Sequence, residues 1–259
     1  MYIISIGSSA GGAGKTTISA NLAYELFQAD HQILLIEASA SHVLGISFGS
    51  GIASKRGLSD LFDQDSGSLQ SVIEQNAHAL APDFSILTYG RRSNVHAVNP
   101  VEDVQRLFEG LAALKVESRY RDTIVIVDLP SALPAMSAAF AASDMILNIV
   151  EPSFVSLAAN TQVRILPEFA NRSEFSVILN KLDSRSIAGR DAEMVARAMF
   201  DKQCIGQIHY DEAVVEASGQ KSVVGQYAPA SLAAHDFAQL ASRIADALDS
   251  PTNQLQTLS

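Results

Sequence analysis

Residues 8–17, Ser-Ser-Ala-Gly-Gly-Ala-Gly-Lys-Thr-Thr, combine the residue types that can hold a chain of phosphates. Closely spaced glycines let the backbone curl until successive N–H groups point toward phosphate oxygens. A lysine after them can reach the β- and γ-phosphates, and a following threonine hydroxyl can bind Mg²⁺. The alternative is a glycine-rich turn that opens an ordinary helix. We predict a nucleotide site formed by Gly11, Gly12, Ala13, Gly14, Lys15, Thr16 and Thr17.

A loop of this kind works only between a buried strand and the start of a helix. Residues 2–7, YIISIG, form a short apolar run typical of a buried strand. Residues 16–27 repeat apolar side chains at three- and four-residue spacing, as on one face of a helix. The sequence therefore predicts strand, loop and helix in that order, with the partial positive charge of the helix N-terminus directed at the phosphates.

Asp128 is the second residue with a predicted chemical role. It ends the apolar run 123–128, and the carboxyl end of a buried strand lies on the ligand side of a parallel sheet. There a carboxylate can hold Mg²⁺ through a water molecule. The alternative is an aspartate that only caps the following turn. Beside a phosphate-binding loop we favour the metal role.

Strand and helix patterns alternate along the rest of the chain. Such alternation predicts an α/β fold: a doubly wound, mostly parallel sheet with helices on both faces, as in P-loop NTPases. We predict a single domain over residues 1–249 and a polar tail over 250–259. Further strand-like runs are 32–39, 84–90, 145–152 and 175–183, and helical spacing recurs at 101–114 and 232–248.

Composition excludes several classes of protein. Apolar residues make up 47 % of the 259, so intrinsic disorder is not expected. One cysteine rules out a disulfide framework. No apolar run approaches the roughly 20 residues that span a bilayer, and the start does not read as a signal peptide, so we expect a cytoplasmic protein. The net charge of −10, without a long run of Lys or Arg, argues against non-specific binding to nucleic acid.

The glycine-rich loop, the LLIEAS strand that follows it and the VIVDLP strand together resemble the ParA/MinD family of deviant P-loop ATPases. The resemblance covers almost the whole chain. It implies ATP and Mg²⁺ as ligands and an ATP-dependent homodimer. It also implies that Asn180 reads the adenine, that His209, Tyr210 and Asp211 line the base, and that Glu37 lies near the metal.

Two departures from the family pattern bear on catalysis. The family carries a lysine before the paired glycines that crosses the dimer interface, and here that residue is Ala10. The family also carries an aspartate that orients the attacking water, and here that residue is Ser39, which cannot act as a carboxylate does. We therefore predict nucleotide binding with weak or absent hydrolysis and no assigned catalytic residue. Ser9 replaces a glycine, which matters only if that position needs a positive φ.

Two functions remain open from the sequence. Within the family, the chain is most similar to the MinD-like members of bacterial cellulose-secretion operons. That likeness implies a nucleotide-gated dimeric scaffold or regulator that works with a small accessory subunit and the inner-membrane cellulose synthase complex, and reaches the membrane only through these partners. The alternative is a cycling ATPase of the partition type that positions DNA or protein cargo. The charge, Ala10 and Ser39 favour the scaffold.

Overall fold

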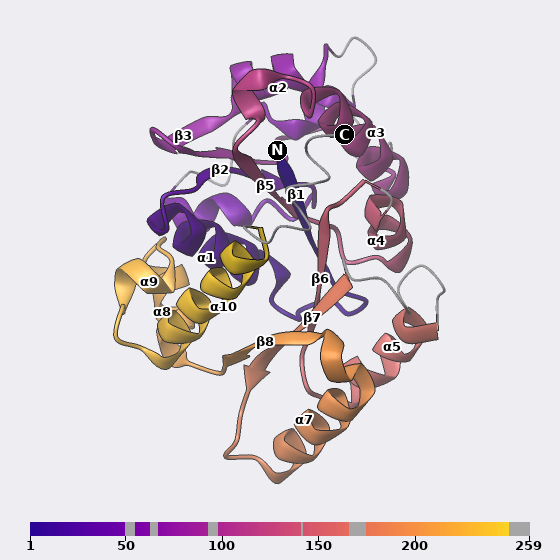
Figure 1. The fold of residues 1–259 in the computed structure, drawn as a ribbon, viewed down its shortest axis with the longest axis vertical. Coiled ribbons are helices and arrows are strands. Elements are labelled where there is room, and N and C mark those ends of the chain that lie inside the picture. Colours follow the sequence, from indigo (N-terminus) through magenta and orange to yellow (C-terminus); the bar gives the residue numbers. More distant parts are fainter. Residues whose placement is uncertain (50–54, 63–66, 93–97, 141, 166–174, 249–259) are drawn as a thin grey trace.

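The computed structural model describes residues 1–49, 55–62, 67–92, 98–140, 142–165 and 175–248. The predicted polar tail, 250–259, lies outside the described residues. Within them, one sheet has the strand order β3-β4-β2-β5-β1-β6-β7-β8 (Figure 1). β3 runs antiparallel to β4, and the other pairings are parallel. The strands are β1 Tyr2–Gly7, β2 Gln32–Glu37, β3 His78–Ala81, β4 Phe84–Leu87, β5 Thr123–Asp128, β6 Met145–Val150, β7 Phe175–Leu182 and β8 Cys204–His209.

Helices cover both faces of this sheet. In Figure 1, α1, α8, α9 and α10 lie together on one side, while α3, α4, α5 and α7 lie on the other. The helices are α1 Lys15–Gln28, α2 Leu69–Asn76, α3 Pro100–Leu114, α4 Leu133–Phe140, α5 Phe154–Ile165, α7 Ile187–Phe200, α8 Glu212–Gly219, α9 Val224–Tyr227 and α10 Leu232–Leu248. The predicted doubly wound α/β architecture is therefore confirmed.

The sheet separates two apolar cores, because neighbouring strand residues point to opposite faces. Ile3 and Val125 pack into the core beneath α3, α4, α5 and α7, and Ile4 and Ile126 pack into the core beneath α1 and α10. Both faces are thus covered, which explains why these strands show no polar alternation. Burying each such aliphatic side chain contributes roughly 1.5–3 kcal/mol.

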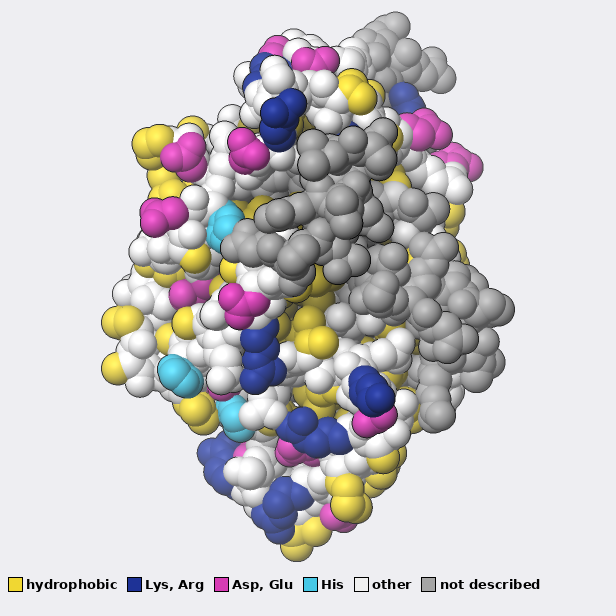
Figure 2. All heavy atoms as spheres, in the orientation of Figure 1, with side chains coloured by type: hydrophobic (Ala, Val, Ile, Leu, Met, Phe, Trp, Pro, Cys, Tyr) yellow, Lys and Arg dark blue, Asp and Glu magenta, His cyan; other side chains and the backbone are white. Residues whose placement is uncertain are grey.

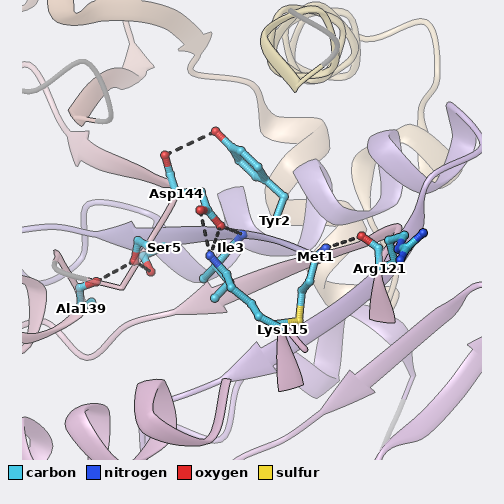
Figure 3. A network of polar contacts seen from close by, with 9 residues as sticks. Met1, Tyr2, Ile3, Ser5, Lys115, Arg121, Ala139 and Asp144 are labelled. Carbon is cyan, nitrogen blue, oxygen red and sulfur yellow. Dashed lines mark hydrogen bonds and ion pairs between the residues drawn. The ribbon is translucent and has the colours of Figure 1, made fainter. Parts of the chain in front are cut away.

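The amino-terminal end of β1 is tied to the segment before β6 by a polar network (Figure 3). The Ile3 amide donates to Asp144 Oδ2 at 2.8 Å, and Lys115 Nζ pairs with the same carboxylate at 2.8 Å. The Met1 ammonium donates to the Arg121 carbonyl, and burial lowers the pKa of that ammonium. These contacts hold the amino end of the sheet and leave its carboxyl end for the loops that carry the predicted site.

Sequence patterns missed two edge strands. β3 has the sequence HALA and is mostly exposed or half-buried. β8, CIGQIH, is buried at alternate residues only, because it is the last strand of the sheet. The strongest patterns were accurate: the helix expected at 232–248 is α10, Leu232–Leu248. Among the described residues no helix has the length and apolarity needed to cross a membrane.

Candidate nucleotide site

The glycine-rich loop joins β1 to α1 at the carboxyl end of the sheet, as the sequence predicts. Gly12 has φ 76° and Gly14 has φ 95°, values in the left-handed region that favours glycine. Gly14 caps the N-terminus of α1, and its carbonyl accepts the Ile18 amide at 2.9 Å. No atom lies within 4 Å of where a Cβ on Gly11 or Gly12 would stand, so this part of the loop faces open space. The loop has the backbone of a phosphate cradle.

The two unusual residues before the paired glycines fit the loop without backbone strain. Neither Ser9 nor Ala10 has a positive φ, so the glycine that Ser9 replaces is not required here. The Ser8 hydroxyl accepts the Ala10 amide at 3.2 Å and thereby fixes the entry to the loop. The replacement of glycine by Ser9 therefore adds no backbone strain to the loop, although the Ser9 hydroxyl is buried without a hydrogen-bond partner among the described residues.

Lys15, the first residue of α1, has a side chain held inside the site. The residue is 8 % exposed, and its Nζ donates to the hydroxyl of Ser131, which lies after β5. Burial lowers the pKa of Lys15, and the nearby Asp128 carboxylate partly opposes that effect. The contact with Ser131 was not predicted, since no short-range pattern links residues so far apart in the sequence.

Thr16 and Asp128, the two residues predicted at the metal, lie in direct contact. Thr16 Oγ1 donates to Asp128 Oδ2 at 2.7 Å, and Ser19 Oγ donates to Asp128 Oδ1 at 3.4 Å. Asp128 is fully buried, and burial raises the pKa of its carboxyl to about 7. The Thr16 hydrogen bond and the charge of Lys15 lower the pKa of Asp128, whereas Glu37 raises it further.

Glu37 ends β2 directly opposite Asp128 on β5, so the structure places both carboxylates at the same edge of the sheet. Each oxygen of Glu37 already accepts backbone hydrogen bonds. Oε1 receives the amides of Val43 and Leu44 at 2.8 and 3.0 Å, and Oε2 receives the amide of Tyr89 at 3.2 Å. Glu37 therefore anchors the chain after β2 and β4, and its role at a metal stays a prediction.

Asn180 and Lys181 bring β7 against the phosphate loop. Asn180 Nδ2 donates to the Ala13 carbonyl at 2.7 Å, and Lys181 Nζ donates to the Gly12 carbonyl at 2.7 Å. Lys181 also pairs with Glu151 Oε2 at 3.0 Å. A Cβ on Gly14 would lie 2.2 Å from Asn180 Nδ2, so glycine is required at this approach. The adenine contact predicted for Asn180 stays a prediction.

Lys181 was missed because neighbouring residues in a regular strand point to opposite faces. Here Lys181 has φ 59°, and the pairing of β7 with β8 shifts register between Asn180 and Leu182. This irregularity lets two successive side chains reach the same loop. In the sequence, only the adjacent Asn180-Lys181 pair could have indicated that Lys181 contacts the phosphate loop.

The structure places His209, Tyr210 and Asp211 at the end of β8, and each residue makes a different kind of contact; the Tyr210 hydroxyl, for example, donates to Glu212 Oε1 at 2.8 Å. His209 Nδ1 lies 2.8 Å from Asp236 Oδ2, which joins β8 to α10. Asp211 caps α8 by accepting the Ala213 amide at 2.9 Å. Tyr210 is 41 % exposed, and its amide donates to the Leu182 carbonyl at 2.9 Å. Tyr210 is thus the member of the three best placed for a ligand at the end of β7.

The residues of this site fit a magnesium-bound nucleotide. The loop offers open space over Gly11 and Gly12, with Lys15 at its end. The Thr16 hydroxyl and the Asp128 carboxylate lie 2.7 Å apart beside the loop, and both carry oxygen atoms of the kind that Mg²⁺ and its bound water molecules prefer. Thr16 and Asp128 are therefore able to hold the ion together with phosphate oxygens and water.

Comparison with known proteins gives the family. The sequence model of the family described as cellulose biosynthesis protein BcsQ matches residues 1–244. The chain belongs to the BcsQ family. The BcsQ of Escherichia coli K12 is 24 % identical over 250 residues, which are 93 % of this chain and 93 % of that protein. An uncharacterised ATP-binding protein of Methanocaldococcus jannaschii is 26 % identical and covers 94 % of this chain and 88 % of its own length.

Solved structures place this BcsQ-family chain among the MinD- and ParA-like P-loop folds. MinD of Aquifex aeolicus superposes with a TM-score of 0.75 at 20 % identity, covering 95 % of this chain and 97 % of that one. MinD of Pyrococcus horikoshii, solved as a complex with Mg-ADP, gives a TM-score of 0.72 at 22 % identity, with 96 % and 97 % covered. The predicted likeness to the ParA/MinD family is therefore confirmed at the level of the fold.

Proposed function

We propose that this protein binds ATP with Mg²⁺ and acts as a nucleotide-gated dimeric scaffold of a bacterial cellulose synthesis and secretion complex, with weak or absent hydrolysis. The observation that carries the proposal is an intact phosphate cradle without the two catalytic accessories. Gly12, Gly14 and Lys15 keep the geometry of a binding loop, whereas Ala10 and Ser39 stand where the family uses a lysine and an aspartate.

Binding follows from the groups already in place. Lys15 exchanges the Ser131 hydroxyl for phosphate oxygens, and the loop amides donate to the same phosphates. Thr16 would bind the metal through its hydroxyl, and Asp128 would hold it through a water molecule. When bound, Mg²⁺ supplies positive charge that neutralises the phosphates. Because Lys15 meets the ligand next to Ser131, it links the nucleotide to the segment between β5 and α4.

Slow turnover follows from the groups that are missing. A cation that stabilises the charge developing on the γ-phosphate is worth about 10³- to 10⁵-fold in rate in related chemistry. Ala10 removes such a cation, and Ser39 cannot orient water as a carboxylate does. A protein that binds ATP and cleaves it slowly holds one conformation for a long time, which suits a scaffold better than a cycling motor.

The partners in the proposal come from the family. The chain belongs to the BcsQ family of cellulose biosynthesis proteins, which supports a role in making cellulose. Within that role, we propose a small accessory subunit and the inner-membrane cellulose synthase complex as its partners. The chain acts in the cytoplasm and is recruited to the membrane through these proteins. α10 supports indirect recruitment, because Phe237, Leu240 and Ile244 are buried in the core and Arg243 donates to the Ile205 carbonyl at 2.7 Å.

The charge distribution favours the scaffold over a partition ATPase that binds DNA. The net charge is −10. On the face in Figure 2, Lys and Arg side chains are interspersed with Asp and Glu, although several basic side chains lie toward the lower end, near β8 and α7. Non-specific DNA binding depends on many phosphate contacts from Lys and Arg. We therefore expect no measurable duplex binding at physiological salt.

One experiment tests the scaffold role in cells and in solution. A strain that lacks the gene is complemented with the wild type or with Lys15→Ala, and secreted cellulose is measured. The mass of each purified protein is measured by light scattering with and without Mg·ATP. We expect the wild type to restore cellulose and to double its mass with ATP, and Lys15→Ala to do neither. Cellulose production that is independent of the gene would contradict the proposal.

A further inference from the structure

α8, which runs from Glu212 to Gly219, has one side in the core and one side open to solvent. Ala217 is buried, whereas Val215 is 59 % exposed. Glu212, Val215 and Glu216 are three and four residues apart, so they lie on the same outward face of the helix. This face therefore presents an apolar side chain to solvent between two carboxylates.

Two tyrosines lie at the borders of this face, and each is held by one of its glutamates. The Tyr210 hydroxyl donates to Glu212 Oε1 at 2.8 Å, and the Tyr227 hydroxyl, at the end of α9, donates to Glu216 Oε2 at 3.2 Å. The two tyrosines are 41 % and 42 % exposed. A tyrosine whose hydroxyl is already held offers a large apolar area and loses little conformational entropy when a partner binds.

The start of α10 adds a further apolar side chain to the same region. Asp211 joins the starts of the two helices, because Oδ1 accepts the Ala213 amide at 2.9 Å and Oδ2 accepts the Ala233 amide at 3.1 Å. Leu232, the residue before Ala233, is 52 % exposed. In Figure 1, α8, α9 and α10 accordingly lie together. We define the α8 surface as Tyr210, Glu212, Val215, Glu216, Tyr227 and Leu232.

The α8 surface is negatively charged. Over residues 209–232 the chain has three acids and a single lysine. Within the described residues, Glu212 and Glu216 accept hydrogen bonds from the two tyrosines but form no ion pair with Lys or Arg. Arg185, a nearby cation, is paired with Asp183 instead. Both glutamates are therefore able to pair with cations that a partner brings.

This charge decides between classes of partner. A nucleic acid or an anionic membrane would be repelled by the two glutamates and by the net charge of −10. A second copy docked through the same surface would bring like charges together. A basic protein segment is attracted at long range by the whole chain and at contact by the glutamates. Apolar side chains on that segment match the exposed Val215 and Leu232.

We propose that the α8 surface is the docking site for a basic, amphipathic segment of a protein partner. Lys or Arg side chains of that segment pair with Glu212 and Glu216, and its apolar side chains cover Val215 and Leu232 beside the two tyrosines. This partner is one that the proposed scaffold holds, so the assignment rests on that proposed function. Because α8 follows β8 closely, the partner sits next to the segment predicted to line the base.

Fluorescence anisotropy with the full chain tests this docking site, and three labelled peptides of about 18 residues serve as probes. The first peptide repeats Lys and Leu so that a helix has one basic and one apolar face. The second has Ser in place of Leu, and the third has Glu in place of Lys. At physiological salt we expect the Lys/Leu peptide to bind with a Kd of about 100 μM or below, and the other two at least about tenfold more weakly.

Variants of the chain locate the binding. Glu212→Gln with Glu216→Gln removes both charges but keeps an oxygen that accepts each tyrosine hydroxyl. This double variant should bind the Lys/Leu peptide about three- to tenfold more weakly. Val215→Ser should weaken binding about threefold or more, because it removes apolar contact. The matched control, Glu102→Gln with Glu109→Gln, removes two exposed charges from α3 and should change the affinity less than about twofold.

Three results would overturn the docking site: no binding of the Lys/Leu peptide, equal binding of the three peptides, or the same loss of affinity in the two double variants. Circular dichroism of each variant separates these results from a misfolded chain, and each is also titrated with ATP. ATP binding without peptide binding would remove the docking site and leave the nucleotide function intact. Peptide binding by a chain that does not bind ATP would do the reverse.

Discussion

The two sides of the nucleotide site differ in how their charged groups are held. On the side of β2 and β5, Asp128 and Glu37 are fully buried and Lys15 is 8 % exposed, and each is fixed by hydrogen bonds. On the side of β7, the side chains of Lys181 and Glu151 are 40 % and 38 % exposed, and Arg185 is 76 % exposed. The charged groups of the first side are thus held in place inside the protein, whereas those of the second side are open to solvent.

This difference also sets the size of the effects expected from mutation. Buried charges interact through a medium of low dielectric constant, so removing one partner has large consequences. Exposed ion pairs are screened by water and salt and typically contribute less than about 1 kcal/mol. Substitutions of the buried groups near Asp128 should therefore alter affinity and stability much more than substitutions of the exposed groups near β7.

The largest effect is expected at Lys15. Lys15→Ala removes a charge-assisted contact to the phosphates and should lower ATP affinity by about 100-fold or more, measured by calorimetry. Lys115→Ala is a matched control, because Lys115 pairs with Asp144 at the opposite end of the sheet and should leave ATP affinity unchanged. Equal affinity in Lys15→Ala and the wild type would disprove the phosphate role of the loop.

Asp128→Asn should make the nucleotide-free protein more stable above neutral pH. The folded protein holds a proton on Asp128 up to a pKa of about 7, whereas the unfolded chain releases it near the ordinary aspartate pKa of 3.8. The stability of the wild type therefore falls as pH rises from about 4 to 7. Removing the buried charge should raise the free energy of unfolding at pH 8 by roughly 2–4 kcal/mol, with little gain at pH 5.

Thermal unfolding of Asp128→Asn and the wild type at both pH values measures this difference. In Asp128→Asn, adding Mg²⁺ should no longer increase the affinity for ATP. In the wild type, the increase in ATP affinity caused by Mg²⁺ should become larger as pH rises through about 7, because Asp128 then loses its proton. Ser19→Ala removes a 3.4 Å hydrogen bond to Asp128 but keeps the carboxylate, so this variant should retain the Mg²⁺-dependent part of ATP affinity. A stability difference that is the same at pH 5 and pH 8 would contradict the raised pKa of Asp128.

A smaller effect is expected from Lys181→Met, which keeps an unbranched side chain but removes the contacts with Gly12 and Glu151. Because the pair is about 40 % exposed, we expect ATP affinity to fall only about three- to tenfold. Glu151→Gln, which leaves the Gly12 contact in place, should produce a still smaller change. If Lys181→Met lost as much ATP affinity as Lys15→Ala, the exposed groups near β7 would be as important for binding as the buried groups near Asp128.

The positions of the phosphate loop and of Asp128 in the fold could be predicted from the sequence because both follow local rules. The loop lies in one continuous segment, 11–17, and Asp128 ends an apolar strand at the edge where ligands bind. The contacts of β7 with the phosphate loop could not be predicted from the residues alone. The approach of β7 to the loop depends on a positive φ at Lys181 and a shift in strand pairing, and neither leaves a periodic pattern in the sequence.

Contacts between residues far apart in the sequence also could not be predicted. The pairing of Lys15 with Ser131 joins residues 116 positions apart, and the amides that surround Glu37 come from two separate loops. Composition and spacing indicate which residues can do chemistry, but they do not show which partners those residues already have. For Glu37 this matters directly, because three backbone hydrogen bonds compete with the metal role implied by the family.

The central claim is that this protein binds ATP without effective hydrolysis because Ala10 and Ser39 replace two catalytic groups. A single-turnover phosphate-release assay tests it most directly, on the wild type, Ala10→Lys, Ser39→Asp, the double variant and Glu37→Gln. Groups that act on one transition state are non-additive, so we expect the wild type and both single variants near background and the double variant clearly faster. Brisk hydrolysis by the wild type, lost in Glu37→Gln, would contradict the account and identify a working ATPase.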